Sequence, residues 1–277
     1  MDLQLAGKTA FVTGGSKGIG KAIARALSEE GVRVAIMARN PDTTIAAAKE
    51  IEEATGTAVL AAPGDTTRPD QIEDAVRLTV DTCGSLDILV SNAGVPGGIG
   101  FGPLPSVSDE QVMKDLETKF LGTLRCARAA APHMQRNRWG RIIGIAGLSA
   151  RYTSRYKTER NANASFNYSG GPRNVAVIHL MRTLSHELGG DGITANAVLP
   201  GATRTEDLDA MLERRARAEG RDVEELRRES ARDNAIQRWV TARELADVVT
   251  FLASPRASSI SGEVIAATGG AGLAVFS

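Results

Sequence analysis

Thr13-Gly14-Gly15-Ser16-Lys17-Gly18-Ile19-Gly20 joins an apolar segment, Thr9 to Val12, to an alanine-rich segment that begins near Lys21. Glycines at these spacings let the backbone turn sharply, bring its N–H groups close to a pyrophosphate and pack a helix tightly on a sheet. The N-terminus of that helix adds partial positive charge. A second apolar segment, Val32 to Ala38, completes a strand–helix–strand unit. This context predicts a dinucleotide-binding turn whose residues are Gly14, Ser16, Lys17, Gly18, Ile19 and Gly20.

Apolar segments and helix-forming segments alternate along the rest of the chain. Strands are expected near residues 9–12, 32–38, 57–62, 86–91, 140–145, 193–199 and 263–267. Such alternation predicts parallel strands joined by right-handed crossovers, with helices on both faces of the sheet. The predicted fold class is therefore α/β, a doubly wound parallel sheet of the Rossmann type, and residues 1–277 are expected to form a single domain.

Composition excludes several classes of function. The 277 residues are 42% hydrophobic and 24% charged, and the formal net charge is zero. This balance gives no reason to expect nucleic acid or a membrane surface as a partner. We expect a cytoplasmic protein, because no apolar stretch of about 18 residues occurs and the N-terminus lacks a secretion-signal pattern. Cys83 and Cys126 are expected to be buried thiols, and no metal site is expected.

The glycine stretch resembles the signature of the short-chain dehydrogenase/reductase family, Thr-Gly-x-x-x-Gly-x-Gly, at every fixed position. Further family markers follow in the same order over nearly the whole chain: Asp65, Asn92-Ala93-Gly94, Pro200-Gly201 and Gly269-Gly270. The resemblance implies that Asp65 lies near the adenine of a nicotinamide cofactor. It also implies that Asn92, Ala93, Gly94, Pro200, Gly201, Thr203 and Thr205 bind that cofactor, although Thr205 equally suits the N-cap of a helix.

The end of the second strand distinguishes between the two nicotinamide cofactors. An acid there pairs with a free ribose 2′-hydroxyl, whereas an arginine accommodates a 2′-phosphate. Ala38 occupies the position where NAD-using relatives commonly have aspartate, and Arg39 follows it. Lys17 adds a second cation within reach of a phosphate. We therefore predict NADP(H), with two solvated surface cations as the alternative.

The catalytic residues of the family are altered in this chain. The resemblance implies a serine and a tyrosine at the reacting oxygen, a lysine four residues after the tyrosine, and an asparagine on a neighbouring helix. The serine position falls on Gly147, so Ser149 is the candidate substitute, with an ordinary loop hydroxyl as the alternative. Tyr168 begins a stretch like the family's tyrosine motif, but Pro172 stands where the lysine is expected.

Aligning instead on the helix that follows places Asn174 at the lysine position and Tyr168 in the loop before the helix. The intervening proline suits the first turn of a helix, which favours this alignment. On the neighbouring helix, Lys119 occupies the asparagine position. Lysine and asparagine would then have exchanged places, with Lys119 supplying the ammonium group and Asn174 a polar tether. The alternative is that Lys119 snorkels to solvent or pairs with Glu117 or Asp115.

Two rival proton donors, Tyr152 and Tyr156, lie in an enlarged loop between Ser149 and Tyr168. Their four-residue spacing suits a short helix with one aromatic face equally well.

Residues 203–238 resemble the family's mobile substrate lid, and apolar residues such as Leu212 and Leu226 are expected to cover the reacting carbon. The resemblance also implies a homodimer or homotetramer, formed through the helices that contain residues 126–131 and 175–188.

Three functions are compatible with these residues. The leading hypothesis is an NADP-dependent oxidoreductase that acts on a carbonyl or secondary alcohol of a small molecule, with Tyr168 as proton donor. The second is a non-redox reaction on the same scaffold, such as isomerisation or elimination. The third is a non-catalytic dinucleotide-binding protein, because the glycine turn is intact while the family's serine and lysine are not.

Overall fold

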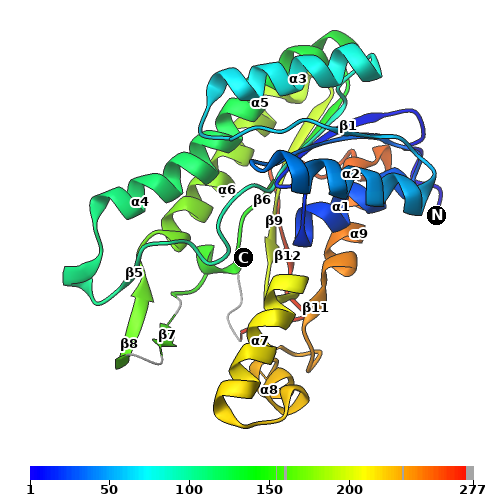
Figure 1. Cartoon of the computed structure of the whole chain (residues 1–277). Coiled ribbons are helices and arrows are strands. Elements are labelled where there is room, and N and C mark those ends of the chain that lie inside the picture. The colour runs from blue at the N-terminus through cyan, green and yellow to red at the C-terminus, as the bar shows by residue number, and fades with distance from the viewer. Residues whose placement is uncertain (154, 159–160, 233, 273–277) are drawn as a thin grey trace.

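The computed structural model describes residues 1–153, 155–158, 161–232 and 234–272, and their side chains except within 154–165. Seven strands form the central sheet, in the order β12-β9-β6-β4-β1-β2-β3 (Figure 1). Every pairing between neighbours is parallel. The predicted fold class and the seven predicted strands are confirmed: β1 Thr9–Thr13, β2 Arg33–Met37, β3 Val59–Ala61, β4 Ile88–Ser91, β6 Gly140–Ile145, β9 Ile193–Pro200 and β12 Val264–Ala267.

Helices cover both faces of this sheet. Successive strand residues point to opposite sides, so neighbouring residues of one strand pack against different helices. Val12 packs in the core cluster shared with α1 (Gly18–Glu29), α2 (Pro41–Thr55) and α9 (Ala242–Ala253). Phe11 packs in the other cluster, shared with α3 (Pro69–Cys83), α5 (Gly122–Asn137) and α6 (Gly170–Leu188). Both faces being covered explains why the strands are continuous apolar runs in the sequence.

The helical segment that carries Lys119 is not uniform. An α-helix, α4 (Asp109–Asp115), continues into a π-helical segment, Leu116–Leu121, and then into α5. Ser108 begins α4 with a capping box, in which it exchanges hydrogen bonds with Gln111. π-helical turns are rare and often occur at functional sites.

A small antiparallel sheet lies beside the main one. It has the order β5-β8-β7, formed by Phe101–Gly102, Asn161–Asn167 and Arg155–Thr158, and it lies below α4 in Figure 1. Tyr156 is therefore in a strand, and the short helix considered for this loop is wrong. One end of β8 pairs with β5, which lies about 65 residues earlier in the chain, and local spacing does not reveal such a partner.

Residues 203–241 form a separate, mainly helical unit next to the sheet. Thr203–Arg204 (β10) pairs with Val240–Thr241 (β11), and α7 (Glu206–Glu219) packs on α8 (Val223–Ser230). Leu212 and Leu226 are each 1% exposed because they pack in a cluster of their own with Ala216, Ala231 and Trp239. The expectation that these two leucines cover the reacting carbon is therefore wrong.

The remaining short elements are 3₁₀ turns at Leu104–Ser106, Leu148–Ala150, Gly189–Asp191 and Pro255–Ala257. Cys83 and Cys126 are free, buried thiols, as predicted. Within the described ranges, no helix has both the length and the apolar character that a bilayer crossing requires. His, Cys, Asp and Glu side chains of the same ranges form no cluster of three that could hold a metal ion.

Replacing Ile143 by Ala should lower the free energy of unfolding by about 3 kcal/mol, because this β6 side chain is 1% exposed and its loss leaves a cavity. Ile45→Ala is the matched control, since Ile45 is 56% exposed on α2, and it should change stability by less than about 0.5 kcal/mol. Urea denaturation of both variants measures the difference. Equal losses would contradict a central position for β6.

Candidate active site

The glycine turn between β1 and α1 is shaped to receive an anion. Gly14 and Gly18 have φ values of 67° and 53°, a left-handed conformation that favours glycine. Lys17, at the N-cap of α1, makes no side-chain capping hydrogen bond, and the first turn contains no acid. The N–H groups at this helix end are therefore left for a ligand, and they fit the pyrophosphate of a dinucleotide.

The segment after β4 is hydrogen-bonded to this turn. Asn92 Nδ2 donates hydrogen bonds to the carbonyl oxygens of Thr13 and Gly14, at 3.1 and 3.2 Å. The backbone N–H of Ala93 donates to Thr13 Oγ1 at 3.1 Å. These contacts bring two of the predicted cofactor segments together at the carboxyl edge of the sheet, where the fold class places ligands.

The two predicted phosphate-binding cations are placed differently. Lys17 Nζ lies 2.5 Å from Asp207 Oδ2, so its charge is paired with α7. Arg39 is exposed just beyond the end of β2, and no ion-pair partner for it occurs in the part of the chain that the structure describes. Arg39 is thus the more available of the two for an added phosphate.

The other predicted cofactor residues also lie after strand ends. Asp65 follows β3, and its Oδ1 accepts a hydrogen bond from Thr67 N at 2.9 Å, which shapes the turn into α3. Pro200 ends β9, and the buried Thr203 donates to the carbonyl oxygen of Gly201 at 3.1 Å. Thr205 caps α7, as its alternative interpretation predicts. Ser16 and Ile19, in the glycine turn, are half-buried.

Lys119 is buried and points toward the end of β6. Its Nζ donates a hydrogen bond to the carbonyl oxygen of Ala146 at 3.1 Å. Its stem passes Gly94 so closely that a Cβ added there would lie 3.2 Å from Lys119 Cδ. Glu117 and Asp115 each pair with an arginine instead. The alternative in which Lys119 snorkels to solvent or pairs with one of these acids is therefore wrong.

The environment of Lys119 changes its proton affinity. Burial is the largest cause, and it lowers the pKa of the ammonium group from 10.5 to about 7. The nearby charge of Arg173 lowers this pKa as well, while Asp115 raises it. The Lys119 amine can consequently gain or lose a proton near neutral pH.

Asn174 fills the space left by the missing serine. A Cβ added to Gly147 would lie 2.6 Å from Asn174 Nδ2. The same Nδ2 donates a hydrogen bond to Ser149 Oγ at 3.0 Å, in the 3₁₀ turn that follows β6. Asn174 Oδ1 is buried, and no described residue donates a hydrogen bond to it. This acceptor is available to a water or a ligand.

Tyr168 lines a cavity of about 350 Å³ together with Ser149, Arg151 and Tyr152. The Tyr152 hydroxyl also packs on the C-terminal segment, because a Cβ added to Gly272 would lie 2.6 Å from it. Tyr152 and Tyr168 thus both remain candidates for the proton donor. The side chain of Tyr156 is outside the described residues. Lys119 and Asn174 contact residues 146–149 instead of lining this cavity.

One pair of residues beside the site was not assigned a role from the sequence. Asp115 and Arg173 form an ion pair with 2.6 Å between Oδ1 and Nη1, and their side chains are 1% and 3% exposed. Asp115 lies four residues before Lys119, and Arg173 directly precedes Asn174. An acid four residues before Lys119 and an arginine directly before Asn174 were the available signal.

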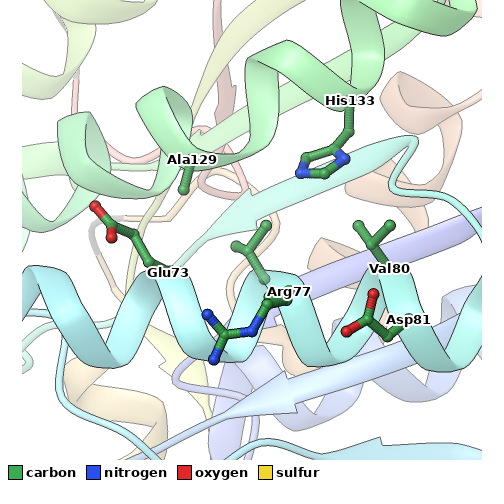
Figure 2. Close-up of a pocket in the computed structure, with 7 residues that line it drawn as sticks. Glu73, Arg77, Val80, Asp81, Ala129 and His133 are labelled. Atoms are coloured by element: carbon green, nitrogen blue, oxygen red, sulfur yellow. The ribbon is translucent and has the colours of Figure 1, made fainter.

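A second hollow of about 230 Å³ lies between α3 and α5. Figure 2 shows Glu73, Arg77 and Asp81 on one helix and His133 on the other. It includes none of the residues predicted for cofactor or catalysis. The candidate active site is therefore the edge of the sheet where β1, β4, β6 and β9 end.

Comparison with known proteins gives the family. A family model described as enoyl-(acyl carrier protein) reductase matches residues 14–272. The short-chain reductase protein NovJ of Streptomyces niveus is 32% identical over 264 residues, which are 94% of this chain and 92% of that protein. The chain belongs to the short-chain dehydrogenase/reductase family. Like its named relatives, this short-chain dehydrogenase/reductase is an enzyme of the oxidoreductase class.

Solved structures agree over almost the full length. L-sorbose reductase from Gluconobacter frateurii, complexed with NADPH and L-sorbose, superposes with a TM-score of 0.88 at 28% identity and covers 98% of both chains. A 7α-hydroxysteroid dehydrogenase complexed with NADH and 7-oxo glycochenodeoxycholic acid superposes with a TM-score of 0.80 at 27% identity, covering 98% of this chain and 96% of that one. These neighbours support a nicotinamide dinucleotide as the cofactor of this short-chain dehydrogenase/reductase.

The lowered pKa of Lys119 should make stability depend on pH. Between pH 7 and 10.5 the unfolded chain holds a proton on this lysine that the folded chain has released. The free energy of unfolding should therefore rise with pH in this window, by about 1.4 kcal/mol per pH unit, relative to Lys119→Met.

Urea denaturation of the unmodified chain and of Lys119→Met, at several values between about pH 6 and 9, measures this difference. Below about pH 7 it should be flat, because both states of the unmodified chain are then protonated. A difference that stays constant across the whole range would show that Lys119 keeps its ordinary pKa.

Proposed function

We propose that this enzyme is an NADP(H)-dependent oxidoreductase that interconverts a carbonyl group and a secondary alcohol on a small-molecule substrate. The observation that carries the proposal is the convergence of Lys119 and Asn174 on residues 146–149, next to the cavity lined by Tyr168. These contacts supply a titratable amine, an amide and a hydroxyl at the strand edge where the family binds its cofactor. Both structural neighbours described above are bound to nicotinamide cofactors, in agreement with a redox role.

Each side chain has a distinct part in the proposed reaction. A bound nicotinamide supplies or accepts the hydride at carbon. Tyr168 exchanges a proton with the substrate oxygen, and the Ser149 hydroxyl, oriented by Asn174 Nδ2, holds that oxygen by a hydrogen bond. Lys119 carries the positive charge that the family normally places after the tyrosine, and its amine can return a proton near neutral pH. In this proposal the ammonium group comes from residues 116–121, on the opposite side of the site from the family's usual lysine position.

The preference for NADP(H) rests on Arg39. The exposed guanidinium beyond β2 suits a 2′-phosphate, and Ala38 provides no acid to bind a free 2′-hydroxyl. Lys17 would have to leave Asp207 before it could contribute. Because the relatives described above include one bound to NADPH and one bound to NADH, the choice depends on this chain's own residues.

We also propose that α7 and α8 form the substrate lid and that the enzyme is a homo-oligomer. The ion pair between Lys17 and Asp207 supports the first proposal, since it already connects the start of α7 to the glycine turn. The second proposal rests on the family, whose members associate through the helices that correspond to residues 126–131 and 175–188 of this chain.

Removing the Arg39 side chain should weaken NADPH binding about tenfold or more, the usual value of a charge-assisted hydrogen bond, and leave NADH binding unchanged. Arg136→Ala, an exposed arginine in the last turn of α5, is the matched control. Titration calorimetry with both cofactors measures the dissociation constants. Tighter binding of NADH than of NADPH by the unmodified chain would overturn the preference.

Tyr168→Phe keeps the ring and deletes the proton, so turnover should fall about 100-fold while NADPH binding is retained. The assay is NADPH consumption with a panel of ketones and aldehydes, which also tests the function as a whole. Tyr152→Phe is the matched control because Tyr152 lines the same cavity.

Loss of turnover in Tyr152→Phe or Tyr156→Phe, with full turnover in Tyr168→Phe, would move the proton donor into the segment between Ser149 and Tyr168. Absence of NADPH consumption with every carbonyl would favour a non-redox reaction or a non-catalytic binding protein.

A further inference from the structure

The carboxylate of Asp115 joins three segments that are far apart in the sequence. Its Oδ1 accepts a hydrogen bond from Arg173 Nη1 at 2.6 Å. Its Oδ2 accepts one from the backbone N–H of Ile99 at 2.8 Å and another from the hydroxyl of Ser169. The loop after β4, the end of α4 and the start of α6 are thus held by one side chain.

These bonds extend to the backbone of Tyr168, the proposed proton donor. The backbone N–H of Tyr168 donates to the carbonyl oxygen of Gly100 at 2.8 Å. The N–H of Gly100 donates in turn to Ser169 Oγ at 2.9 Å, and Ser169 is bonded to Asp115. The position of the tyrosine therefore depends on a network whose centre is Asp115.

The same ion pair lies next to the segment that carries Lys119: Asp115 directly precedes the π-helical residues 116–121, and these residues pack on α6, which carries Arg173. Among the described residues, the charged side chains that act on its amine are Asp115 from α4 and Arg173 from α6. The loops after β4 and β6 face Lys119 with Gly94 and with the carbonyl oxygen of Ala146. The Arg173 charge disfavours the charged form of the amine, and the Asp115 charge favours it.

We propose that Asp115 and Arg173 are positioning residues: the pair fixes the Tyr168 segment and sets the proton occupancy of the Lys119 amine through two opposing charges. The roles of Tyr168 and Lys119 belong to the proposed function, on which this inference rests. The charge effect on Lys119 can nevertheless be measured without any turnover. A buried pair with only a structural role would lose stability when either partner is replaced, but it would not move the titration of Lys119 in opposite directions.

The test is the titration of Lys119, followed by the ¹³C resonance of its Cε in the whole chain labelled with [ε-¹³C]lysine. The chain has seven lysines, and Lys119→Met identifies the resonance by its disappearance. Asp115→Asn should lower the titration midpoint by about one pH unit, whereas Arg173→Gln should raise it by a similar amount. The double variant removes both buried charges, so it tests the proposal even where a single variant fails to fold. Its midpoint should lie between those of the two single variants, because the two charges act in opposite directions, so it can be compared with whichever single variant folds.

The matched control is an ion pair of the same length on the surface. Arg77 and Asp74 on α3 are also 2.6 Å apart, but both side chains are about two-thirds exposed. Asp74→Asn and Arg77→Gln should leave the Lys119 resonance unchanged at every pH.

Kinetics test the effect on Tyr168. Asp115→Asn should lower kcat about tenfold with the KM for NADPH unchanged, and the pH profile of kcat should shift in the direction of the Lys119 midpoint. Shifts of the midpoint in the same direction for Asp115→Asn and Arg173→Gln, an unmoved midpoint in both, or an unchanged kcat would overturn the proposal. Failure of the proposed function would appear separately, as absence of NADPH turnover in the unmodified chain, while the titration would still report on the charge effect.

Discussion

Parallel pairing of the central strands determines where everything else in this molecule lies. In the register of the sheet, Thr13 is opposite Ser91, and Ser91 is opposite Gly144. Three strands that are far apart in the sequence therefore end at nearly the same level. Each continues into a segment at the carboxyl edge of the sheet, where ligands bind in this fold class. The glycine turn, the segment Asn92-Ala93-Gly94 and the segment 146–149 meet for this reason alone. Helix α1 and the Lys119 side chain then approach a common edge.

Burial at that edge explains the unusual chemistry of the site. A lysine withdrawn from water loses much of its preference for the charged form. Among the described residues, Lys119 Nζ is held by the carbonyl oxygen of Ala146 and forms no ion pair with a carboxylate. Asp115, the acid whose charge raises the pKa of this amine, is occupied by Arg173 and by two further donors. A fully bonded carboxylate is the condition under which a buried charge pair is tolerated beside an active site.

The sequence was informative where a feature depends on local order. Strands buried on both faces must be continuous apolar runs, and a dinucleotide turn needs glycine at fixed spacings, so the sheet and the cofactor edge could be predicted. The positions of Lys119 and Asn174 followed from alignment to motifs. The pairing of β8 with β5 and the bond from Asp115 to Arg173 could not be predicted, because each joins residues more than 50 positions apart and leaves no periodic pattern. The separate cluster under α7 and α8 was missed because its apolar residues are irregularly spaced.

The Asn174 amide lies where a side chain at residue 147 would be, and this limits how the site can change by mutation. A serine at residue 147 would place its Cβ 2.6 Å from Asn174 Nδ2, so the amide would have to move. Restoring serine alone meets the amide, and replacing the amide alone leaves a void beside Ser149 and removes the donor that orients it. Conversion between this arrangement and the common one is therefore easier when residues 147 and 174 change together. Such epistasis would keep a lineage with this site apart from its relatives even where the surrounding sheet is nearly the same.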